Sequence, residues 1–557
     1  MLAEDGQKMS KRKKNYPPPE EVIKACGADA LRLYLINSPV VRADDLRFKK
    51  EGVKQNLRDI FLPWYHAYRL FVQSASAQER QSGASFQPNA TLALASSNVM
   101  DRWILAAANS LVAFMRCEME AYRLYTVVPR LVQMVEQLTN WYIRMNKERF
   151  AGERGTEAQT ASLSTLFEVL HMLCRMMAPL TPFFCELMYR NLRRAVPNAA
   201  ASVHFLLIPE VIPGAIDMQI ESDVHQMQQT IEKGRAIRDR NTLSARTPLP
   251  EVSFIHHDLA SLQAVEKLQE YIKEELNVRS LTTALVSEVP GLVQLKCLPN
   301  HRVLGARFGS DYKQVQAMIR ALKHEELTAF MSSGCLAIGE HYFSSNDILV
   351  QIEYRGDRSV RDADEVDGGL VLLHCHPDTS MLAEAMAREV CAKVQKMRKE
   401  AHLRKSDEIE TCFSCAQDSL ICRVLTQQAE YVANRIGIRL TPLSARPACA
   451  VSLFCKQDEV RTQALVEGKV VQQLEQLTLE LVRGFPALHA ARLAQLVPDE
   501  ALRADVGNYV LCLDLASLRQ RLCGSDELRF MLNGQAIALK LGHHLFFSQR
   551  ELFAAQK

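Results

Sequence analysis

The sequence predicts a mainly α, multidomain protein with a helical bundle first and α+β domains toward the C-terminus. Apolar residues recur at helical spacing in several long segments before about residue 240. Short stretches typical of strands become frequent only after about residue 250. A chain of 557 residues also exceeds what one hydrophobic core usually holds. No apolar run has the length of a membrane span, so we expect no membrane association.

The N-terminal elements follow from proline, glycine and apolar spacing. Pro17-Pro18-Pro19 should end an opening loop, because proline fixes its own backbone and disfavours helix at the residue before it. A short helix is predicted over Glu20–Ala25 and should stop at Gly27. The next helix should be capped by Asp29 or Ala28 and carry on one face Leu31, Leu35 and Ile36. The spacing predicts helix over 46–75, and the polar composition of 76–97 predicts a loop or domain boundary.

Three long helices with short connections should then form a bundle: one opened by Asp101, one over about Val128–Phe150, and one over Leu163–Arg194. In the second, the predicted core stripe comprises Leu131, Val135, Leu138, Tyr142 and Met145. The opposite face comprises Gln133, Gln137, Asn140, Arg144 and Lys147. Amides on such a face suit unstacked RNA bases, and Trp141 lies at its border, where it would stack or pack.

The remaining chain mixes helices and strands. Helices are predicted over 223–240, 312–322 and 381–402, and strands near 251–255, 280–286, 292–298, 336–339, 349–354 and 370–373. Farther on, a helix is predicted over Val466–Val482, with short α segments near 487–496 and 516–522. Asn533-Gly534 lies between two strand-like runs and predicts a β-hairpin.

Charge and cysteine usage narrow the function classes. With 67 basic and 64 acidic residues, the net charge is only +3, which argues against a protein that coats DNA through one basic field. Local basic patches remain compatible with this balance. The 15 cysteines have no repeated spacing, which is typical of reduced thiols rather than of a disulfide framework.

One cysteine pair, Cys412 and Cys415, has metal-like spacing, with Cys422, His374 and His376 as possible companions. There is no second pair of this kind. The alternation of Ile409, Thr411 and Phe413 is explained more simply by a strand, so no structural metal is expected.

A basic run near the N-terminus, Lys8-Met9-Ser10-Lys11-Arg12-Lys13-Lys14, is the most informative motif. Gly6 precedes it and prolines follow it, so it should form a mobile cationic loop rather than part of a core. Lysine is a compact charge on a flexible stem and a typical partner for phosphate oxygens. On charge alone, the run is more typical of a disordered tail, a localisation signal or a general nucleic-acid patch.

The residues Lys8-Met9-Ser10-Lys11-Arg12 resemble the Lys-Met-Ser-Lys-Ser signature loop of class I aminoacyl-tRNA synthetases, with Arg12 in place of the last serine. Later segments resemble the cytosolic type of isoleucyl-tRNA synthetase and follow in the same order to about Ile409. They are Gly27–Arg32, Ile36–Phe48, Asp101–Ile104, Asn140–Asn146, Ala178–Phe183, Ile237–Arg240 and Glu274–Arg279.

This resemblance implies a domain order. Residues 1–27 would hold the signature loop and the end of a catalytic domain, and 28–95 a stem-contact helical region. The anticodon-binding bundle would span 96–209, a C-terminal α+β region 210–440, and a small α+β appendage 441–557. The implied protein is a cytoplasmic isoleucine–tRNA ligase that acts on isoleucine, tRNA-Ile and ATP with Mg²⁺.

The resemblance also implies site residues. Lys11 and Lys8 would be catalytic, because lysines on a mobile loop can neutralise charge that develops on phosphate oxygens. The ATP-binding residues would be Lys8, Met9, Ser10, Lys11 and Arg12. The tRNA-binding residues would be Asn140, Trp141, Arg144, Lys147 and Arg149.

Two other interpretations stay open. The sequence contains no His-Ile-Gly-His nucleotide motif, so it resembles a C-terminal half that we expect to be inactive by itself. A non-catalytic tRNA-binding module derived from such an enzyme is one alternative. A scaffold that meets multi-synthetase partners through residues 441–557 is another. An in-frame His-Ile-Gly-His motif upstream of Met1 would favour the enzyme.

Overall fold

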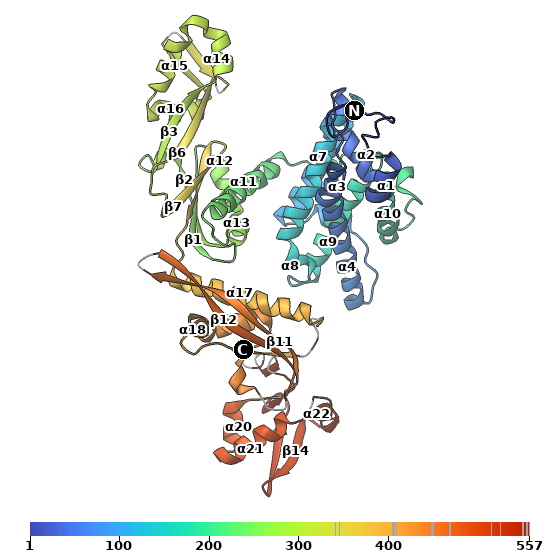
Figure 1. Ribbon diagram of the computed structural model, residues 1–557, viewed down its shortest axis with the longest axis vertical. Helices are drawn as coiled ribbons and strands as arrows, with labels where there is room; N and C mark the ends of the chain where they lie inside the picture. The colour runs from blue at the N-terminus through green and yellow to red at the C-terminus, as the bar shows by residue number, and fades with distance from the viewer. Residues whose placement is uncertain are drawn as a thin grey trace. The chain divides into compact units, whose positions relative to one another are not determined.

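The computed structural model describes residues 1–339, 341–344, 346–403, 407, 409–446, 450–466, 469–513, 515–523, 525–548, 551–552 and 555. The chain divides into two compact units, Met1–Gln228 and Gln229–Lys557, whose elements are labelled in Figure 1. The division falls inside helix α11 (Met218–Arg240), later than the boundary expected after residue 209. Within the described residues, no helix is both long and apolar enough to cross a membrane.

The first unit is built from helices. Its shorter members are α1 (Pro19–Cys26), α2 (Ala28–Ile36), α3 (Lys50–Asn56), α5 (Ala90–Leu94) and α8 (Lys147–Phe150). Its longer members are α4 (Leu62–Ser82), α6 (Val99–Glu120), α7 (Leu124–Glu136), α9 (Thr156–Met177) and α10 (Pro182–Leu192). Two π-helical turns, η2 (Leu57–Phe61) and η3 (Gln137–Ile143), join α3 to α4 and extend α7. The 3₁₀ turns are η1 (Pro39–Arg42), η4 (Arg193–Ala195) and η5 (Val203–Phe205).

The predicted start of this unit is mostly confirmed. Helix α1 covers the expected residues and ends at Gly27, whose φ of 85° is accessible to glycine without strain. The predicted cap of α2 is wrong, because Gly27 occupies the N-cap and Asp29 is the second residue of the helix. The Asp29 carboxylate instead accepts a hydrogen bond from the Phe184 backbone N–H at 2.7 Å. The buried face of α2 therefore contains Asp29, Ala30 and Leu33 rather than the predicted stripe.

Two predicted boundaries in the helical unit are wrong. The expected loop over 76–97 is partly helical, because α4 continues to Ser82 and α5 follows it. The long helix predicted over Leu163–Arg194 is two helices separated at 178–181. Pro182 begins the second of them, where a missing backbone N–H does no harm, whereas inside a continuous helix it would break a hydrogen bond.

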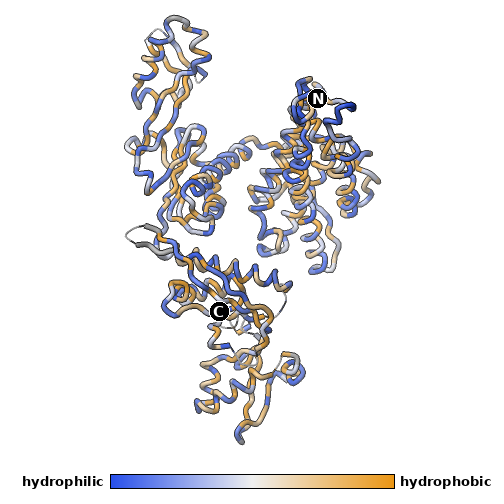
Figure 2. The backbone as a smooth tube through the Cα atoms, viewed as in Figure 1, coloured by the Kyte–Doolittle hydropathy of each residue, from blue (hydrophilic) through white to orange (hydrophobic). Residues whose placement is uncertain are grey.

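The bundle core contains the stripe that the sequence predicts for its second long helix. Leu131, Val135, Leu138 and Tyr142 are at most 1% exposed, and Met145 is half-buried. Helix α7 and the η3 turn contact α6, whose buried residues include Met100, Ile104 and Met115, and α6 contacts α9, where Leu166 and Leu170 are buried. In Figure 2, apolar and hydrophilic positions alternate along these helices, as expected where one face is buried.

The second unit begins with a four-stranded sheet in the order β2-β1-β8-β7. Strands β1 (Leu249–His256) and β2 (Val278–Leu285) are parallel, and their crossover contains α12 (Leu259–Lys267) and α13 (Gln269–Leu276). Strands β8 (Gly369–His374) and β7 (Arg361–Val366) complete the sheet in antiparallel pairing.

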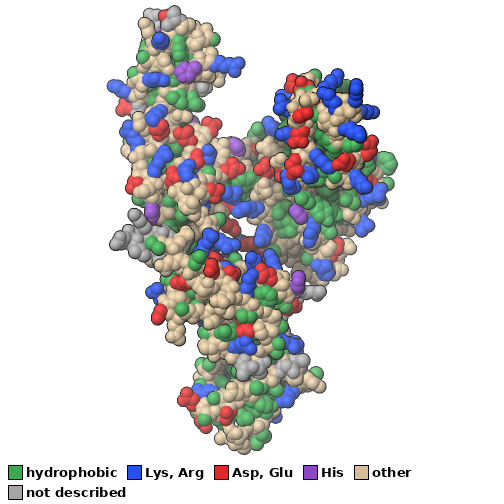
Figure 3. All heavy atoms as spheres, viewed as in Figure 1, with side chains coloured by type: hydrophobic (Ala, Val, Ile, Leu, Met, Phe, Trp, Pro, Cys, Tyr) green, Lys and Arg blue, Asp and Glu red, His purple; other side chains and the backbone are tan. Residues whose placement is uncertain are grey.

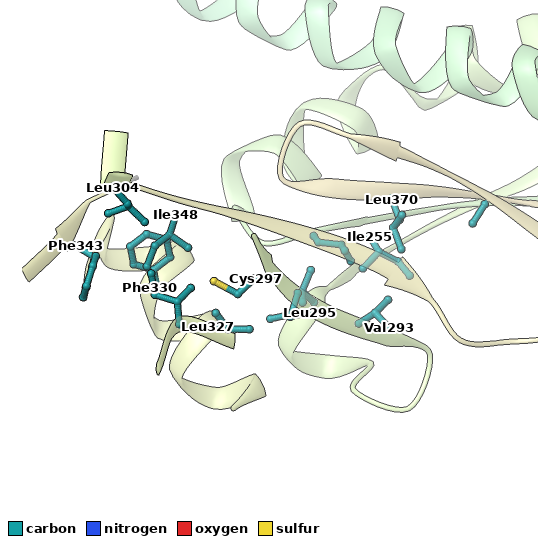
Figure 4. Packing of buried hydrophobic residues seen from close by; sticks show 14 of the residues in the cluster. Ile255, Val293, Leu295, Cys297, Leu304, Leu327, Phe330, Phe343, Ile348 and Leu370 are labelled. Carbon is teal, nitrogen blue, oxygen red and sulfur yellow. The ribbon is translucent and has the colours of Figure 1, made fainter. Parts of the chain in front are cut away.

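A subdomain whose core is continuous with that of the sheet is inserted between β2 and β7. It contains the strand pairs β3 (Val293–Pro299) with β6 (Ile348–Tyr354) and β4 (Cys335–Ile338) with β5 (His341–Ser344). Its helices are α14 (His301–Phe308), α15 (Tyr312–Arg320) and α16 (His324–Ser333). Figure 4 shows Leu304, Phe330, Phe343 and Ile348 gathered at one end of a buried cluster that continues to Ile255 and Leu370.

A second four-stranded sheet has the order β10-β9-β12-β11. It consists of β9 (Ile409–Ser414), β10 (Leu440–Pro442), β11 (Ser452–Val466) and β12 (Lys469–Arg483). Helices α17 (Thr379–Glu400), α18 (Leu420–Gln427) and α19 (Ala429–Ile436) pack on it. The expected boundary after residue 440 runs through this sheet.

The helix predicted over Val466–Val482 is wrong. Its described residues from 469 form strand β12, which pairs with β11 on one side and β9 on the other. Leu477, Leu479 and Leu481 are buried at a spacing of two, which is the strand period. In a helix, residues at this spacing would point in different directions and could not all face one core.

The last part contains β13 (Ala487–Leu488), β16 (Leu545–Phe546), α20 (Ala490–Leu496), α21 (Glu500–Leu511) and α22 (Leu515–Arg521). The predicted hairpin is confirmed as β14 (Glu527–Leu532) paired with β15 (Gln535–Lys540). Asn533 and Gly534 both have positive φ, 51° and 81°, as a two-residue hairpin turn of this hand requires.

Candidate phosphate loop and RNA interface

The basic loop is attached to the helical unit by short backbone contacts on both sides of Leu2. The Leu2 N–H donates to Leu46 O at 2.7 Å, and the Phe48 N–H donates to Leu2 O at 2.9 Å. The Ala3 N–H donates to Gln7 O at 2.8 Å, which closes the tight turn that precedes Lys8. The loop therefore begins from a fixed base beside the 46–48 segment.

Asn15 holds the loop together from inside. Its side-chain Nδ2 donates to Lys8 O at 3.1 Å, and its Oδ1 accepts from the Ser10 N–H at 2.9 Å. The side chains of Lys8, Lys11 and Arg12 are exposed, whereas Met9 and Ser10 are half-buried. Figure 3 shows Lys and Arg side chains gathered over this end of the first unit.

The loop presents cations that are available to an anion. In the part of the chain that the structure describes, no carboxylate forms an ion pair with Lys8, Lys11 or Arg12. Two lysines three residues apart can therefore approach neighbouring phosphate oxygens without first breaking an ion pair. Arg12 stands where the family loop has a serine, so it adds a further donor fork and supplies no hydroxyl.

The predicted RNA face is formed by α7, the η3 turn and α8. Asn140, Arg144 and Lys147 have exposed side chains, and Gln133 is exposed while Gln137 is half-buried. Behind them lies the core stripe, so this side of the element is polar and the other apolar. Within the first unit, α8 lies at the end away from the basic loop (Figure 1).

Two residues of the predicted set do not belong to this face. Trp141 is only 6% exposed and packs in the core, so it presents no open ring for base stacking. Arg149 points inward, where its guanidinium binds both oxygens of the buried Asp101 carboxylate at 2.9 and 2.6 Å. The family resemblance grouped Arg149 with the tRNA-binding residues, and nothing in its local sequence shows that it binds a carboxylate on another helix.

A polar cavity of about 240 Å³, which the sequence pattern does not predict, adjoins the same face. It lies among α6, α7 and the first half of α11. Ser110 Oγ donates to Glu221 Oε1 at 2.6 Å at its wall. The other lining residues are Trp103, Ala107, Leu111, Phe114, Arg130, Gln133, Met134, Gln137, His225 and Gln228. Arg130, Gln133, Met134 and Gln137 recur at helical spacing, so the sequence could have predicted that they share one face. Nothing in the sequence shows that α11 closes the cavity over that face.

The cysteine pair with metal-like spacing lies in a strand, as the alternation of its neighbours predicts. Cys412 is fully buried in β9, and Cys415 follows the strand end, where burial raises its thiol pKa to about 11. Among the described residues, no group of three or more His, Cys, Asp or Glu side chains is placed to hold a metal ion.

Two known families match the segments that contain the basic loop and the polar face. The family described as "tRNA synthetases class I (I, L, M and V)" matches residues 1–47, which include the basic loop. The family described as "Anticodon-binding domain of tRNA ligase" matches residues 101–253, which include the polar face and its cavity.

Individual proteins give the same result over more of the chain. The cytoplasmic isoleucine–tRNA ligase of Mus musculus is 44% identical over 452 residues, which cover 79% of this chain and 36% of the relative. That of Arabidopsis thaliana is 38% identical over 562 residues, or 98% of this chain and 47% of the relative. A probable cytoplasmic isoleucine–tRNA ligase of Dictyostelium discoideum is 42% identical over 442 residues, 79% and 41% respectively.

The chain thus spans less than half the length of these relatives. Its matches nevertheless run from the basic loop at its first residues through the helical bundle and into the second unit. The chain belongs to the class I aminoacyl-tRNA synthetases and is a homologue of their cytosolic-type isoleucyl members.

Proposed function

We propose that this chain supplies the C-terminal part of an isoleucine–tRNA ligase, with the phosphate-binding loop and the anticodon-binding bundle on one structural unit. The proposal depends on the presence of both surfaces on the helical unit. An exposed basic loop lies at one end of the helical unit, and an amide-bearing and cationic face lies at the other. Charging a tRNA requires both, because the reacting phosphates and the anticodon are held at the same time by separate surfaces.

The loop would act on the Mg²⁺ complex of ATP. An isoleucine carboxylate oxygen forms a bond to the α-phosphorus, and the bond from that phosphorus to the bridging oxygen breaks to release pyrophosphate. Lys11, with Lys8, would neutralise negative charge on the phosphate oxygens as it develops. Lys8–Arg12 contains no carboxylate, so these residues fit phosphate oxygens rather than the metal ion.

The bundle would bind the anticodon arm. Lys147 and Arg144 suit phosphate groups, and Asn140, Gln133 and Gln137 offer paired donors and acceptors for the edges of unstacked bases. The cavity beside Gln133 and Gln137, about 240 Å³, has polar walls and two aromatic side chains, Trp103 and Phe114. A single nucleobase is the ligand that these features suit.

Binding of the purified chain to an isoleucine tRNA anticodon arm tests this proposal. We expect tighter binding than to an arm of the same stem with a different anticodon. The expected difference is about 5- to 150-fold, since one lost base contact typically costs about 1–3 kcal/mol. Equal affinity for both arms at several salt concentrations would contradict a reading role for the bundle.

The alternative, a non-catalytic tRNA-binding module, predicts the same binding but no contribution to catalysis. It is separated by joining this chain to the upstream catalytic part of a relative and assaying isoleucine-dependent pyrophosphate exchange. Because the chain itself has no His-Ile-Gly-His motif, we expect no exchange without that part. Activity of the joined protein that depends on Lys11 would favour the ligase.

The cytoplasmic naming of the relatives supports a cytoplasmic location for this chain. The expected role of residues 441–557 in binding other synthetases stays a prediction.

A further inference from the structure

The carboxylate of Asp101 is fully buried at the start of α6 and receives four hydrogen bonds. Ser96 Oγ donates to Oδ2 at 2.6 Å, and Tyr142 Oη donates to Oδ1 at 2.8 Å. Arg149 supplies the other two from its guanidinium, to Oδ1 at 2.9 Å and to Oδ2 at 2.6 Å. Asp101 is 0% exposed and the Arg149 side chain 12%, so the charges are largely shielded from water.

Two of these partners of Asp101 lie within and just after an irregular stretch of backbone. Tyr142 lies within the π-helical turn η3, and Arg149 lies in α8 after it. Asn146 links the two: its Nδ2 donates to Tyr142 O at 2.9 Å, and its Oδ1 accepts from Arg149 Nη1 at 2.6 Å. Asp101, Tyr142, Asn146 and Arg149 therefore form one connected network around the end of the turn, and the Tyr142 hydroxyl also contacts Ser162 O at 3.1 Å.

A π turn needs such support because its hydrogen bonds are less favourable than those of an α-helix, and it is rare for that reason. It also inserts one residue, which rotates everything after it by about 100° around the helix axis relative to a regular helix. Relaxation to a regular helix would carry Arg149 and Asn146 away from Asp101. The network and the π turn are thus mutually dependent.

The turn also separates the two halves of the polar face. Gln133 and Gln137 precede or begin it, and Arg144 and Lys147 follow it. The rotation therefore sets the angle at which the amides of α7 and the cations near α8 meet one RNA. Buried ion networks contribute little net stability compared with an apolar core, but they can select one geometry among several.

We propose that Asp101 is a positioning residue for RNA recognition: through Tyr142 and Arg149 its carboxylate holds the π turn that aligns the two halves of the polar face. The inference rests on the proposed anticodon-binding function. It predicts that weakening the network reduces discrimination between anticodons, while the number of phosphate contacts, and with it the salt dependence of binding, stays the same.

Tyr142→Phe and Arg149→Lys test the inference with the full chain. The first removes one hydroxyl and keeps the ring in the core, and the second keeps the charge but loses the two-pronged contact. Asp101→Asn is the more severe third variant. Val169→Ala, a truncation of a buried side chain on α9 outside the network, controls for lost stability, with melting temperatures compared across all variants.

The first readout is the ratio of dissociation constants for the isoleucine anticodon arm and an arm with a changed anticodon. We expect the ratio to fall about tenfold in Tyr142→Phe and Arg149→Lys and to stay near wild type in Val169→Ala. The second is hydrogen exchange of the backbone amides of 137–143, which should become faster only in the network variants. This exchange measurement needs no RNA, so it reports loosening of the turn even if the Asp101→Asn protein binds RNA poorly.

The outcomes separate the inference from the proposed function. If the wild-type chain discriminates and folded Tyr142→Phe and Arg149→Lys proteins discriminate equally well, the positioning inference is overturned. If the wild-type chain does not discriminate, the proposed function fails, and the exchange data alone then decide whether the network holds the turn. Unchanged exchange at 137–143 in every network variant overturns the inference in either case.

Discussion

The side chain of Asn15 bridges the two arms of the basic loop, donating to Lys8 O at 3.1 Å and accepting from the Ser10 N–H at 2.9 Å. One amide thus restrains the backbone on either side of Met9. The flanking cations stay exposed, so the loop combines a restrained backbone with side chains that a ligand can reach.

Asn15→Ala should loosen this loop without unfolding the bundle. Both contacts of the amide are lost, so the segment between Lys8 and Lys14 should be cut by trypsin several-fold faster. Limited proteolysis followed by mass spectrometry locates the cuts. Gln7→Ala removes only the contact to Lys13 Nζ at 3.0 Å and should leave the rate near wild type. Equal acceleration by both substitutions would contradict a specific role for Asn15.

Lys11→Ala should lower adenylation far more than tRNA binding in a synthetase that contains this chain. Loss of one positioned donor to a developing oxyanion typically reduces the rate about a hundredfold or more. Pyrophosphate exchange and tRNA affinity are measured on the same protein. Lys24→Ala removes an equal charge from the exposed side of α1 and serves as the control. An unchanged exchange rate with weakened tRNA binding would show that the loop is an RNA patch.

His171 should make the bundle sensitive to acid. Its ring stacks between Phe167 and Tyr189, and burial lowers its pKa from 6.5 to about 4. The folded state thus binds the proton more weakly than the unfolded state. The resulting stabilisation is complete above pH 6.5 and is lost as the pH falls from 6.5 toward 4. At 1.36 kcal/mol per unit, the loss should approach about 3 kcal/mol.

Tryptophan fluorescence measures this loss without interference from the second unit, because the protein has three tryptophans and all lie before residue 142. Urea unfolding of wild type and His171→Phe at pH 7 and pH 4.5 isolates the contribution of the imidazole, since phenylalanine can occupy the same stack. The free energy of unfolding should fall less in the variant. An identical fall in both proteins would mean that His171 does not contribute.

Local sequence signals predicted those elements whose burial pattern is contained in one segment. The stripe Leu131, Val135, Leu138 and Tyr142 repeats at helical spacing, and the structure buries all four. The Asn533-Gly534 turn is equally local. The strand β12 was mistaken for a helix because its neighbours in the sheet, β9 and β11, decide its conformation.

In the candidate site too, local spacing predicts the position of some residues but not of those that contact distant segments. Exposure of Asn140, Arg144 and Lys147 follows from the polar face on which helical spacing places them. The inward position of Arg149 does not, because Asp101 lies 48 residues earlier and the π turn changes the register between them. Trp141 is buried for the same reason of tertiary packing. A contact between distant segments has no counterpart in the spacing of either one.

Gly534→Ala should destabilise the hairpin in the second unit by about 1–2 kcal/mol, the usual cost of a left-handed backbone for a residue with a Cβ. A Cβ at Gly534 meets no atom within 4 Å, so the effect would come from its φ of 81° and not from crowding. Hydrogen exchange over 527–540 should accelerate.

Gly507→Ala provides the matched control. Its Cβ would also meet nothing within 4 Å, but the residue lies inside α21, where alanine is favoured over glycine. Exchange should slow in α21 and remain unchanged in the hairpin. Faster exchange in the hairpin of both variants would point to a general loss of stability rather than to turn geometry.

On the polar face, we expect Lys147 to contribute to RNA affinity and Asn140 to discrimination between anticodons. Lys147→Ala should weaken every RNA hairpin alike and reduce the slope of log affinity against log salt by about one unit, because a phosphate contact carries no sequence. Asn140→Ala should reduce discrimination between anticodons and leave that slope unchanged, because an amide contacts base edges. Lys24→Ala again removes a charge elsewhere and should change neither quantity for an isolated anticodon arm.

Titrations of the same two RNA arms at three or more salt concentrations give both quantities for each variant. Both residues are exposed, so their replacement should leave tryptophan fluorescence and melting temperature unchanged, and any binding change can be assigned to the surface. If Asn140→Ala alters only the salt slope, this residue contacts the RNA backbone and the reading group lies elsewhere. The cavity lined by Gln133, Gln137 and Trp103 would then be the next surface to vary.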